Sequence, residues 1–367
     1  MAPYLILLLI SAIVPLAVYR PRSMLSDRTY QVLVKKRNKL TIQLFFIVFF
    51  VLLALRDFSV GTDLDEYQAI FNRCANLSFD GLKNLRWETG YTIYNKLISL
   101  LSEDYRFFLI VTALIVLIPI YKLYVKENRY NLLSILIFIN MPCFLMIFSG
   151  LRQAIAVSMG ILAYMAIKNK KYVLSALTIL LACSFHISAL ALVLLYPIFF
   201  LKIKTKHLFV IVPFMLLIYA FKTQLLLLLF YLLPKKYFDA YGEIKETGAF
   251  AMMILFLIFF VFAFVILDDQ VMTNDDYFMR NIIVVTTIFQ FFVPVHGLIQ
   301  RASYYFMIFV PVSIVRIVQA PKITLKSISN LAILVMGCFF ALFFFYNAAF
   351  STDNLLDVFP YKFFWSE

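Results

Sequence analysis

The feature that most constrains this chain is a series of long apolar runs that recurs from one end to the other. Most of them approach the roughly 20 residues that an α-helix needs to cross a bilayer. Inside lipid every backbone polar group must be satisfied within the segment, which favours helices. We therefore predict an all-α polytopic membrane protein with about 11–12 transmembrane helices. The twelve apolar segments lie at about 3–19, 40–55, 107–125, 130–148, 150–167, 172–185, 187–201, 207–221, 249–267, 281–298, 303–318 and 329–346.

Two stretches leave the number of crossings open. The run "YVLSALTILLACSFHISALALVLLYPIFFL" at 172–201 fits one long tilted helix or two short ones that meet near His186. The run 223–233 is too short to span a bilayer, and we expect it at the membrane interface.

Composition and charge agree with a membrane protein. Hydrophobic residues make up 63% of the chain and charged residues only 14%, too few to cover the surface of a soluble protein of this length. The net charge of +13 could suggest a nucleic-acid partner, but the distribution of the charges among the loops is explained by membrane topology instead. Alternate loops, starting with 20–39, collect 20 of the 33 basic and 6 of the 20 acidic residues. The positive-inside rule places these loops in the cytoplasm and both termini outside, so we expect a multi-pass membrane protein and no nucleic-acid partner.

The chain is expected to form a single transmembrane domain over 1–367 with two large outer, periplasmic loops. In the first, 56–106, apolar residues recur at helical spacing over 67–77 and again over 91–101, which predicts two short amphipathic helices. The second loop covers 222–248. On the inner side, the acidic stretch "DDQVMTNDDYFMR" reads as a solvated connection.

Three arginines at the outer side are candidates for binding phosphate. Arg152 interrupts "FSGLRQAIAVSMG", Arg301 lies in "VHGLIQRASYYF", and Arg56 stands at the membrane edge of the first outer loop. An arginine at a membrane helix centre costs at least about 2.5 kcal/mol, although near a helix end it can reach lipid phosphates instead. Guanidinium binds phosphate oxygens bidentately, and a helix N-terminus adds free N–H donors.

Three residues on the same side could accept a proton: His186, Asp63 and Glu88. Each also has a structural interpretation. Asp63 with Glu66 resembles a helix N-cap with a capping box, Glu88 could be solvated, and His186 could bond to a backbone carbonyl. The sequence leaves open which of the three is the base.

The aromatic residues of the first outer loop could stack on sugars. The candidates are Tyr67, Trp87, Tyr91 and Tyr94. No cofactor or metal cluster is expected, since the only D-x-D pattern in the outer loops is Asp63–Asp65.

Outside the cytoplasm there is no supply of nucleotide donors, so an activated anionic substrate there points to a lipid pyrophosphate and to a transferase that joins sugars from it.

Five sequence blocks together resemble the EpsG-type family of polysaccharide polymerases, which are related in role to the Wzy O-antigen polymerases. The blocks are "VGTDLDEY", "ETGYTIYNKLIS", "SGLRQAIAVSMGILAY", "SFHISAL" and "QRASYYF". The resemblance implies a GT-C-like helical fold and metal-independent polymerisation of undecaprenyl-pyrophosphate-linked oligosaccharide units at the periplasmic face, with O-antigen the favoured product. It also implies Arg152 and Arg301 as pyrophosphate clamps, and a partner protein that regulates chain length.

Three other functions are weighed against this one. A flippase for lipid-linked oligosaccharides would need polar groups through the bilayer midplane, whereas here the arginines and histidines gather at one face. An O-antigen ligase would use the same chemistry with another acceptor. A membrane-bound O-acyltransferase would use a cytoplasmic thioester donor, which outer arginines serve poorly.

Overall fold

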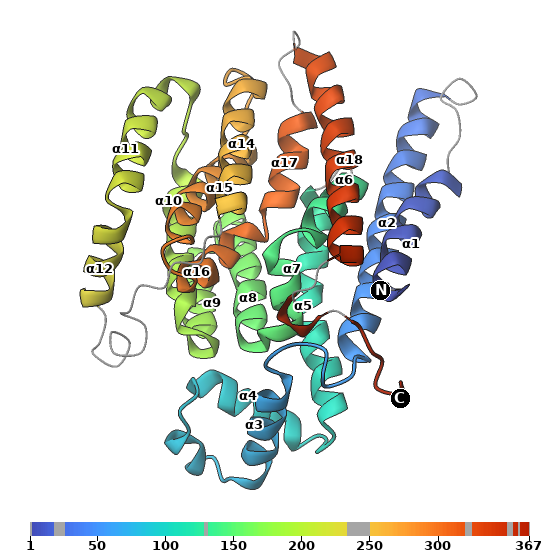
Figure 1. Cartoon of the computed structure of the whole chain (residues 1–367), viewed down its shortest axis with the longest axis vertical. Helices are drawn as coiled ribbons and strands as arrows, with labels where there is room; N and C mark the ends of the chain where they lie inside the picture. The colour runs from blue at the N-terminus through green and yellow to red at the C-terminus, as the bar shows by residue number, and fades with distance from the viewer. Residues whose placement is uncertain are drawn as a thin grey trace. The chain divides into compact units, whose positions relative to one another are not determined.

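The computed structural model describes residues 2–17, 26–127, 131–232, 250–319, 325–350, 355–358 and 360–366. These residues form helices and one isolated bridge between Arg56 and Phe363, and they contain no strand, which confirms the all-α prediction (Figure 1). The chain divides into two compact units. Unit 1 is Met1–Leu190 with Leu334–Glu367, and unit 2 is Ala191–Ile333.

Unit 1 holds most of the predicted site residues. Its helices are α1 (Ala2–Ala17), α2 (Asp27–Ala54), α3 (Leu64–Asn76), η2 (Gly81–Asn84), α4 (Thr89–Ser99), α5 (Tyr105–Glu127), α6 (Asn131–Ile139), α7 (Pro142–Ser149), α8 (Leu151–Lys168), α9 (Tyr172–Phe185), most of α18 (Lys326–Phe350) and η6 (Leu355–Asp357). The turn η3 (Ile187–Leu194) follows α9 and runs into unit 2.

Unit 2 contains the helices from 195 to 319. They are α10 (Leu195–Phe200), η4 (Thr205–His207), α11 (Leu208–Ala220), α12 (Lys222–Leu232), α14 (Phe250–Ile266), α15 (Asn274–Phe292), α16 (Leu298–Met307) and α17 (Val310–Gln319). The part of the predicted second outer loop from 233 to 248 lies outside the described residues.

All twelve apolar segments are helical over most of their described length. Within the described ranges, four helices are long and apolar enough to cross a membrane, and the number rises to seven if each of three bent pairs is one span. Three shorter apolar helices, including α9 and α14, accompany them. One bent pair is α11 and α12, which meet at 72°, so the run expected at the interface is a helix that turns away from α11.

The stretch 172–201 forms two helical pieces, and the break is at His186. Its backbone is extended, with φ −156° and ψ 119°, so α9 ends at Phe185 and helix resumes as 3₁₀ at Ile187. A second break separates α6 from α7, which are bent by 63° before Pro142. Proline cannot donate a backbone hydrogen bond, so a new helix begins there.

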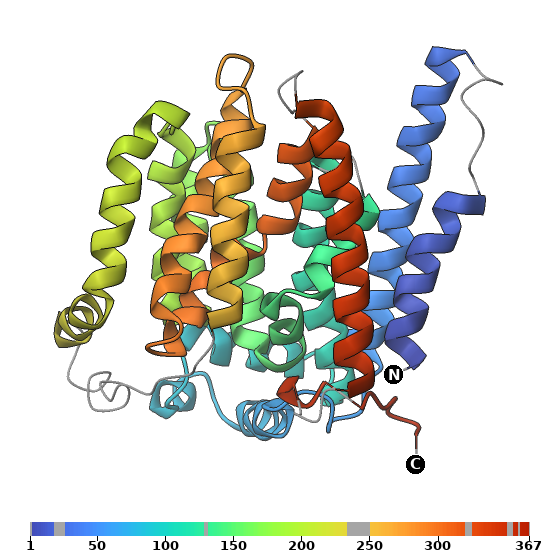
Figure 2. The same cartoon turned by 45° about the horizontal axis from the view of Figure 1, so that its top comes forward.

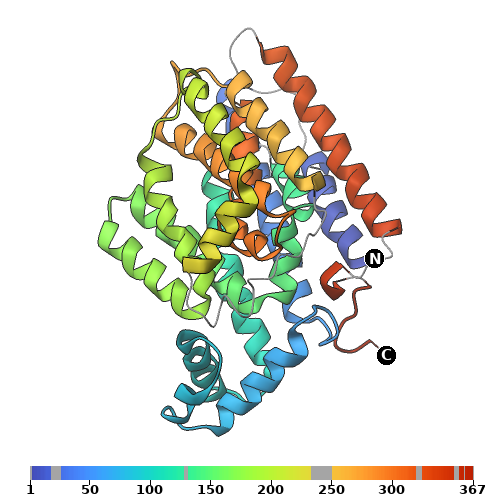
Figure 3. The ribbon, with the colours of Figure 1, turned by 60° about the vertical axis from the view of Figure 1, so that its left-hand side comes forward.

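The two ends of the helices in unit 1 differ in character. At one end α3 and α4, from the 56–106 loop, form a projecting pair beside the ends of α5 and α8 (Figures 2 and 3). We call this the loop end. At the other end Lys168 of α8 forms an ion pair with Glu127 of α5 at 2.5 Å, and Glu127 is buried. Each end therefore collects residues from one set of the alternating loops.

The acidic stretch of unit 2 is only partly the solvated connection expected from sequence, because residues 268–275 are exposed or half-buried whereas 276–280 are buried. Arg280 is fully buried, with an ion pair from its Nη1 to Asp269. Asp276 completes the capping box of Thr273 at the start of α15 and pairs with Arg316 at 2.5 Å. Burial would raise the pKa of Asp276, but hydrogen bonds from Thr273 and Arg316 outweigh it and lower that pKa. The prediction was wrong for 276–280 because it treated these charges singly, whereas pairing allows charged groups to be buried.

Candidate functional site

The site is built around Arg152, in the first turn of α8. The chain breaks at Gly150, which ends α7 and precedes α8, so the first N–H groups of α8 lack partners inside the helix. The guanidinium pairs with the Glu88 carboxylate through Nη1. Arg152 keeps 17% of its side chain exposed and Glu88 keeps 23%, so the pair is accessible without being fully solvated.

Aromatic rings form the floor under Arg152. Its guanidinium carbon lies 4.0 Å from the centre of the Trp87 ring and 5.9 Å from that of Tyr91. Tyr67 packs at 6.1 Å from Trp87 and 5.8 Å from Tyr91, and it accepts a hydrogen bond from Arg152. Contact between a partly desolvated cation and tryptophan contributes about 1–2 kcal/mol, so the ring holds the arginine in place.

Helix α4, which carries Tyr91 and follows Glu88, is docked closely on α9. A Cβ on Gly90 would lie 2.1 Å from the Ser184 hydroxyl and 2.7 Å from its carbonyl oxygen, so only glycine fits. Tyr94 packs 5.9 Å from Phe185 and shares a 2.8 Å hydrogen bond with Thr112 of α5. The block "WETGY" is therefore fixed against the residues just before His186.

The loop before α3 is docked on the break between α7 and α8. The Thr62 N–H donates to the Ser149 hydroxyl at 3.2 Å. Gly61 has φ +118°, and a Cβ there would lie 2.7 Å from the Phe148 carbonyl oxygen. The loop thus brings Asp63 to the same break that starts α8.

Asp63 occupies the N-cap position of α3 as predicted, but the predicted capping box with Glu66 does not form. Its side chain makes no capping hydrogen bond, and Glu66 pairs with Arg86 instead. The reason is the φ of −104° and ψ of 8° at Asp63, which differ from the extended backbone usual at an N-cap.

The predicted sugar-stacking residues differ in exposure. Tyr67 and Tyr91 are buried at 3% and 0% exposure, and burial raises the pKa of Tyr91 well above its usual value. Tyr94 is also buried, whereas Trp87 is partly exposed. The Trp87 Nε1 is buried and has no acceptor among the described residues.

His186 is buried at the C-terminal end of α9, and its Nδ1 shares a 2.6 Å hydrogen bond with the Ser188 hydroxyl. Ser184, two residues earlier, contacts α4 at Gly90. Four of the five sequence blocks therefore meet at the loop end of unit 1.

Arg56 lies inside the protein, with 1% exposure. Its guanidinium carbon is 5.6 Å from the Phe148 ring centre, and its Nε and Nη1 have no hydrogen-bond acceptor among the described residues. Burial lowers the pKa of Arg56 to about 10. The C-terminal segment covers this position, because the Asp57 N–H donates to the Lys362 carbonyl at 2.9 Å and the Tyr361 hydroxyl donates to the Leu52 carbonyl at 2.9 Å.

Arg301 belongs to unit 2, where it lies exposed in the first turn of α16. Nearby, His296 is buried, with its ring centre 5.2 Å from that of Phe230 in α12. The fifth sequence block, which we expected at an outer turn, thus lies at the start of α16 and belongs to the other compact unit from Arg152.

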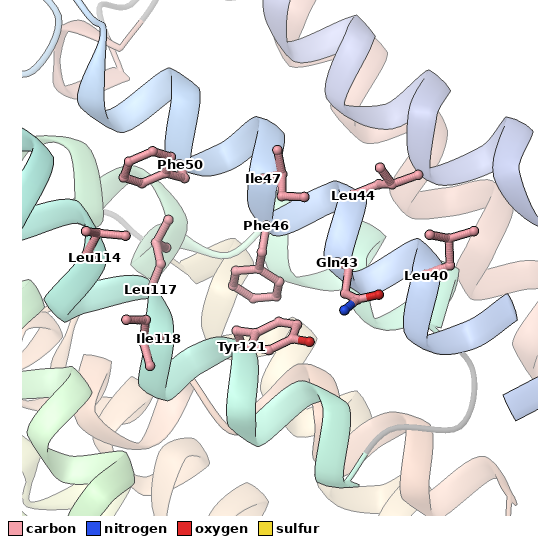
Figure 4. Close-up of a pocket in the computed structure, with 10 residues that line it drawn as sticks. All are labelled: Leu40, Gln43, Leu44, Phe46, Ile47, Phe50, Leu114, Leu117, Ile118 and Tyr121. Carbon is pink, nitrogen blue, oxygen red and sulfur yellow. The ribbon is translucent and has the colours of Figure 1, made fainter. Parts of the chain in front are cut away.

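Two hollows of unit 1 are large enough for a ligand group. One, of about 480 Å³, is an apolar groove between α2 and α5 in which Gln43 and Tyr121 are the polar members (Figure 4). Its lining suits hydrocarbon chains. The other, of about 420 Å³, opens between α3 and the segment before α4, and Trp87 forms part of its wall.

The sequence alone did not identify several residues that shape the site. Ser149 and Ser184 position the two docked loops, and Arg86 neutralises Glu66. Gly90, inside "WETGY", is the one signal that could have been read, since an isolated glycine near a helix start often marks a close approach. The C-terminal cover of Arg56 has no such signal.

Among the residues described, no group of three or more His, Cys, Asp or Glu is placed to hold a metal ion. In a comparison with known protein families, the model of the EpsG family matches residues 39–363. No curated protein and no solved structure matches the chain.

Proposed function

Because the chain belongs to the EpsG family, a family of Wzy-type, polymerase-like proteins, we propose that it polymerises oligosaccharide repeat units carried on undecaprenyl pyrophosphate. Transfer takes place at the periplasmic face of the bacterial inner membrane. The product is O-antigen or a related surface polysaccharide, and the reaction is independent of metal.

The observation that carries the proposal is the pairing of Arg152 with Glu88 over the Trp87 ring, at the start of an apolar helix. A guanidinium at a helix N-terminus suits a pyrophosphate, which it can bind with two parallel hydrogen bonds while the free N–H groups add further donors. A lipid-linked substrate presents its phosphates at the membrane surface, at the depth expected for the first turn of a membrane helix.

The same pairing suggests how binding and chemistry are linked. An incoming pyrophosphate competes with Glu88 for Arg152 and frees the Glu88 carboxylate from its ion pair. Glu88 then takes the proton from an acceptor sugar hydroxyl, whose oxygen attacks the anomeric carbon of the donor. The bond from that carbon to the pyrophosphate oxygen breaks, and Arg152 stabilises the charge on the departing polyprenyl pyrophosphate.

The other predicted residues take supporting roles in this proposal. Trp87 offers the partly exposed ring to a sugar, while Tyr67 and Tyr91 fix it from beneath. Asp63 and His186 border the site and are the alternative bases. Arg301 stays a predicted pyrophosphate ligand, and Arg56 supplies positive potential from the interior of unit 1. The lipid bilayer and a chain-length regulator are the expected partners.

The test is reconstitution of the purified protein with a synthetic polyprenyl-pyrophosphate oligosaccharide, followed by separation of the products on a gel. We expect a ladder of chain lengths from the wild type, none from Arg152→Ala, and little from Arg152→Lys, because an ammonium cannot hold two oxygens as a fork. Arg28→Ala, which removes an exposed arginine of α2, is the matched control and should leave the ladder unchanged.

Other outcomes separate the competing functions. Movement of the lipid across vesicles without any ladder would identify a flippase. Transfer of a single preformed chain to a different acceptor would identify a ligase. A ladder of full intensity from Arg152→Ala would remove Arg152 from the mechanism.

A further inference from the structure

The hollow of about 420 Å³ between α3 and the segment before α4 is unassigned by the mechanism above. Helix α3 contributes one wall, and the end of η2 with the following residues contributes the other. Its lining residues are Glu66, Ala69, Ile70, Arg73, Asn84, Leu85, Arg86 and Trp87.

This hollow adjoins the proposed reaction centre. Trp87 lines it and also lies under the Arg152 guanidinium, at 4.0 Å from ring centre to guanidinium carbon. The next residue, Glu88, is the ion-pair partner of Arg152. A glycan in the hollow would therefore extend from the site at which its terminal hydroxyl reacts.

The lining has the mixed character of a sugar-binding surface. Ala69, Ile70 and Leu85 present apolar atoms against which the C–H faces of a sugar ring can pack, while Asn84 offers both a donor and an acceptor to hydroxyl groups.

The charges in the hollow do not cancel. Glu66 is occupied by Arg86, whose Nη2 forms an ion pair with its carboxylate. Arg73, in the last turn of α3, has no ion pair within the described part of the chain, and it is exposed. One guanidinium at the hollow is therefore available to bind an anion, and arginine binds carboxylates as a planar fork.

We propose that this hollow binds the glycan of the acceptor and that Arg73 selects a repeat unit bearing a carboxylate, such as a uronic acid. The inference rests on the proposed polymerase function and adds the class of substrate to it. The carboxylate of the sugar pairs with Arg73, the ring packs on the apolar wall, and the reacting hydroxyl lies towards Glu88.

The first experiment compares the surface polysaccharide of wild-type cells with that of cells lacking the gene. Loss of the polymer in the deletion supports the proposed function, and a carboxylated sugar in the wild-type polymer supports the inference. A deletion strain that keeps its polymer would contradict the polymerase function. A polymer that depends on the gene but contains only neutral sugars would overturn the inference alone.

The second experiment measures binding of the purified protein to the repeat oligosaccharide released from that polymer, and to the same oligosaccharide after chemical reduction of its carboxyl groups. We expect the reduced form to bind about ten-fold more weakly, which is the size of one charge-assisted bond. Arg73→Gln should bind both forms equally weakly. Lys83→Gln, which removes a charge paired with Asp80 outside the hollow, should behave as the wild type. Equal binding of the two forms by the wild type, or an unchanged preference in Arg73→Gln, would overturn the proposal.

Discussion

Arg152 stands in an apolar helix because its charge is satisfied locally rather than by lipid phosphate. The Glu88 carboxylate neutralises it, and the Trp87 ring covers one side of the guanidinium. Its Nε still has no acceptor among the described residues, so the arginine retains bonding capacity for a further anion. The pair is thus a resting arrangement that a phosphate ligand can exchange, since guanidinium–phosphate bonds are as strong as guanidinium–carboxylate bonds.

Replacement of Glu88 tests this exchange. Glu88→Gln removes the carboxylate that competes for Arg152 and the proposed base together. We therefore expect turnover to fall by about 10²-fold or more, while affinity for the polyprenyl-pyrophosphate substrate is unchanged or tighter. Single-turnover rates and equilibrium binding of the lipid substrate separate the two effects. Glu103→Gln, at an exposed position outside the site, is the matched control. Normal turnover in Glu88→Gln would leave His186 and Asp63 as the remaining bases.

Arg56 presents the opposite case, a buried cation that costs stability. Burial holds its folded-state pKa at about 10, well below the usual value of an arginine. The charged form is therefore disfavoured in the folded protein by about 3 kcal/mol at neutral pH. That cost persists below pH 10, where Arg56 is charged in both states. It disappears only as the pH rises from there towards the pKa that Arg56 has in the unfolded chain. Retention of such a residue indicates a role other than folding.

The variant Arg56→Met should separate folding from function. Methionine fills a similar volume without the charge, so we expect a melting temperature equal to or above that of the wild type. Polymer output should nevertheless fall, because the positive potential beneath the site is lost. Thermal unfolding of the detergent-solubilised protein, measured beside ladder formation, checks both parts. A melting temperature several degrees lower would show that Arg56 is a structural residue.

At the level of elements, the site depends on how α4 is docked on α9. The contact at Gly90 leaves no room for a side chain, since the Ser184 carbonyl oxygen is backbone and cannot rotate away. Gly90→Ala should therefore move α4, carry Trp87 and Glu88 away from Arg152, and destabilise the protein by about 1–3 kcal/mol. Gly337→Ala, in α18, is the control because a Cβ there meets nothing within 4 Å.

Activity and unfolding should be measured together for these two glycine variants. We expect Gly90→Ala to lose the product ladder and melt at a lower temperature, and Gly337→Ala to keep both properties. A fully active Gly90→Ala protein would mean that the position of α4 does not govern the reaction.

The sequence predicted the helices well and their meeting points only in part. Runs of apolar residues determine where helices form in lipid, so the twelve segments and the two loop helices, α3 and α4, were found. Contacts such as Gly61 to Phe148 and Gly90 to Ser184 join residues distant in the chain, which periodicity cannot reveal. The ion pair of Arg152 with Glu88 was not predicted for the same reason, although both residues were candidates for the site.

At the scale of the whole molecule, the loops that the charge pattern assigns to opposite sides of the membrane lie at opposite ends of unit 1. Lys168 and Glu127 meet at one end, while Thr62 reaches Ser149 at the loop end. Loops predicted to share a side of the membrane are therefore grouped in space. Because basic residues favour the cytoplasm, we predict that the loop end faces the periplasm.

Labelling of introduced cysteines tests that orientation. Lys83→Cys lies in the exposed η2 turn of the 56–106 loop, and Lys170→Cys lies exposed between α8 and α9. In a background without the four native cysteines, a membrane-impermeant maleimide added to spheroplasts should label position 83 at once. Position 170 should react only after the membrane is permeabilised. Labelling of both positions from outside would contradict the predicted alternation. The reverse pattern would place Arg152 and Glu88 on the cytoplasmic side. Nucleotide sugars are available there, so the location of the site would no longer favour a lipid pyrophosphate as the donor.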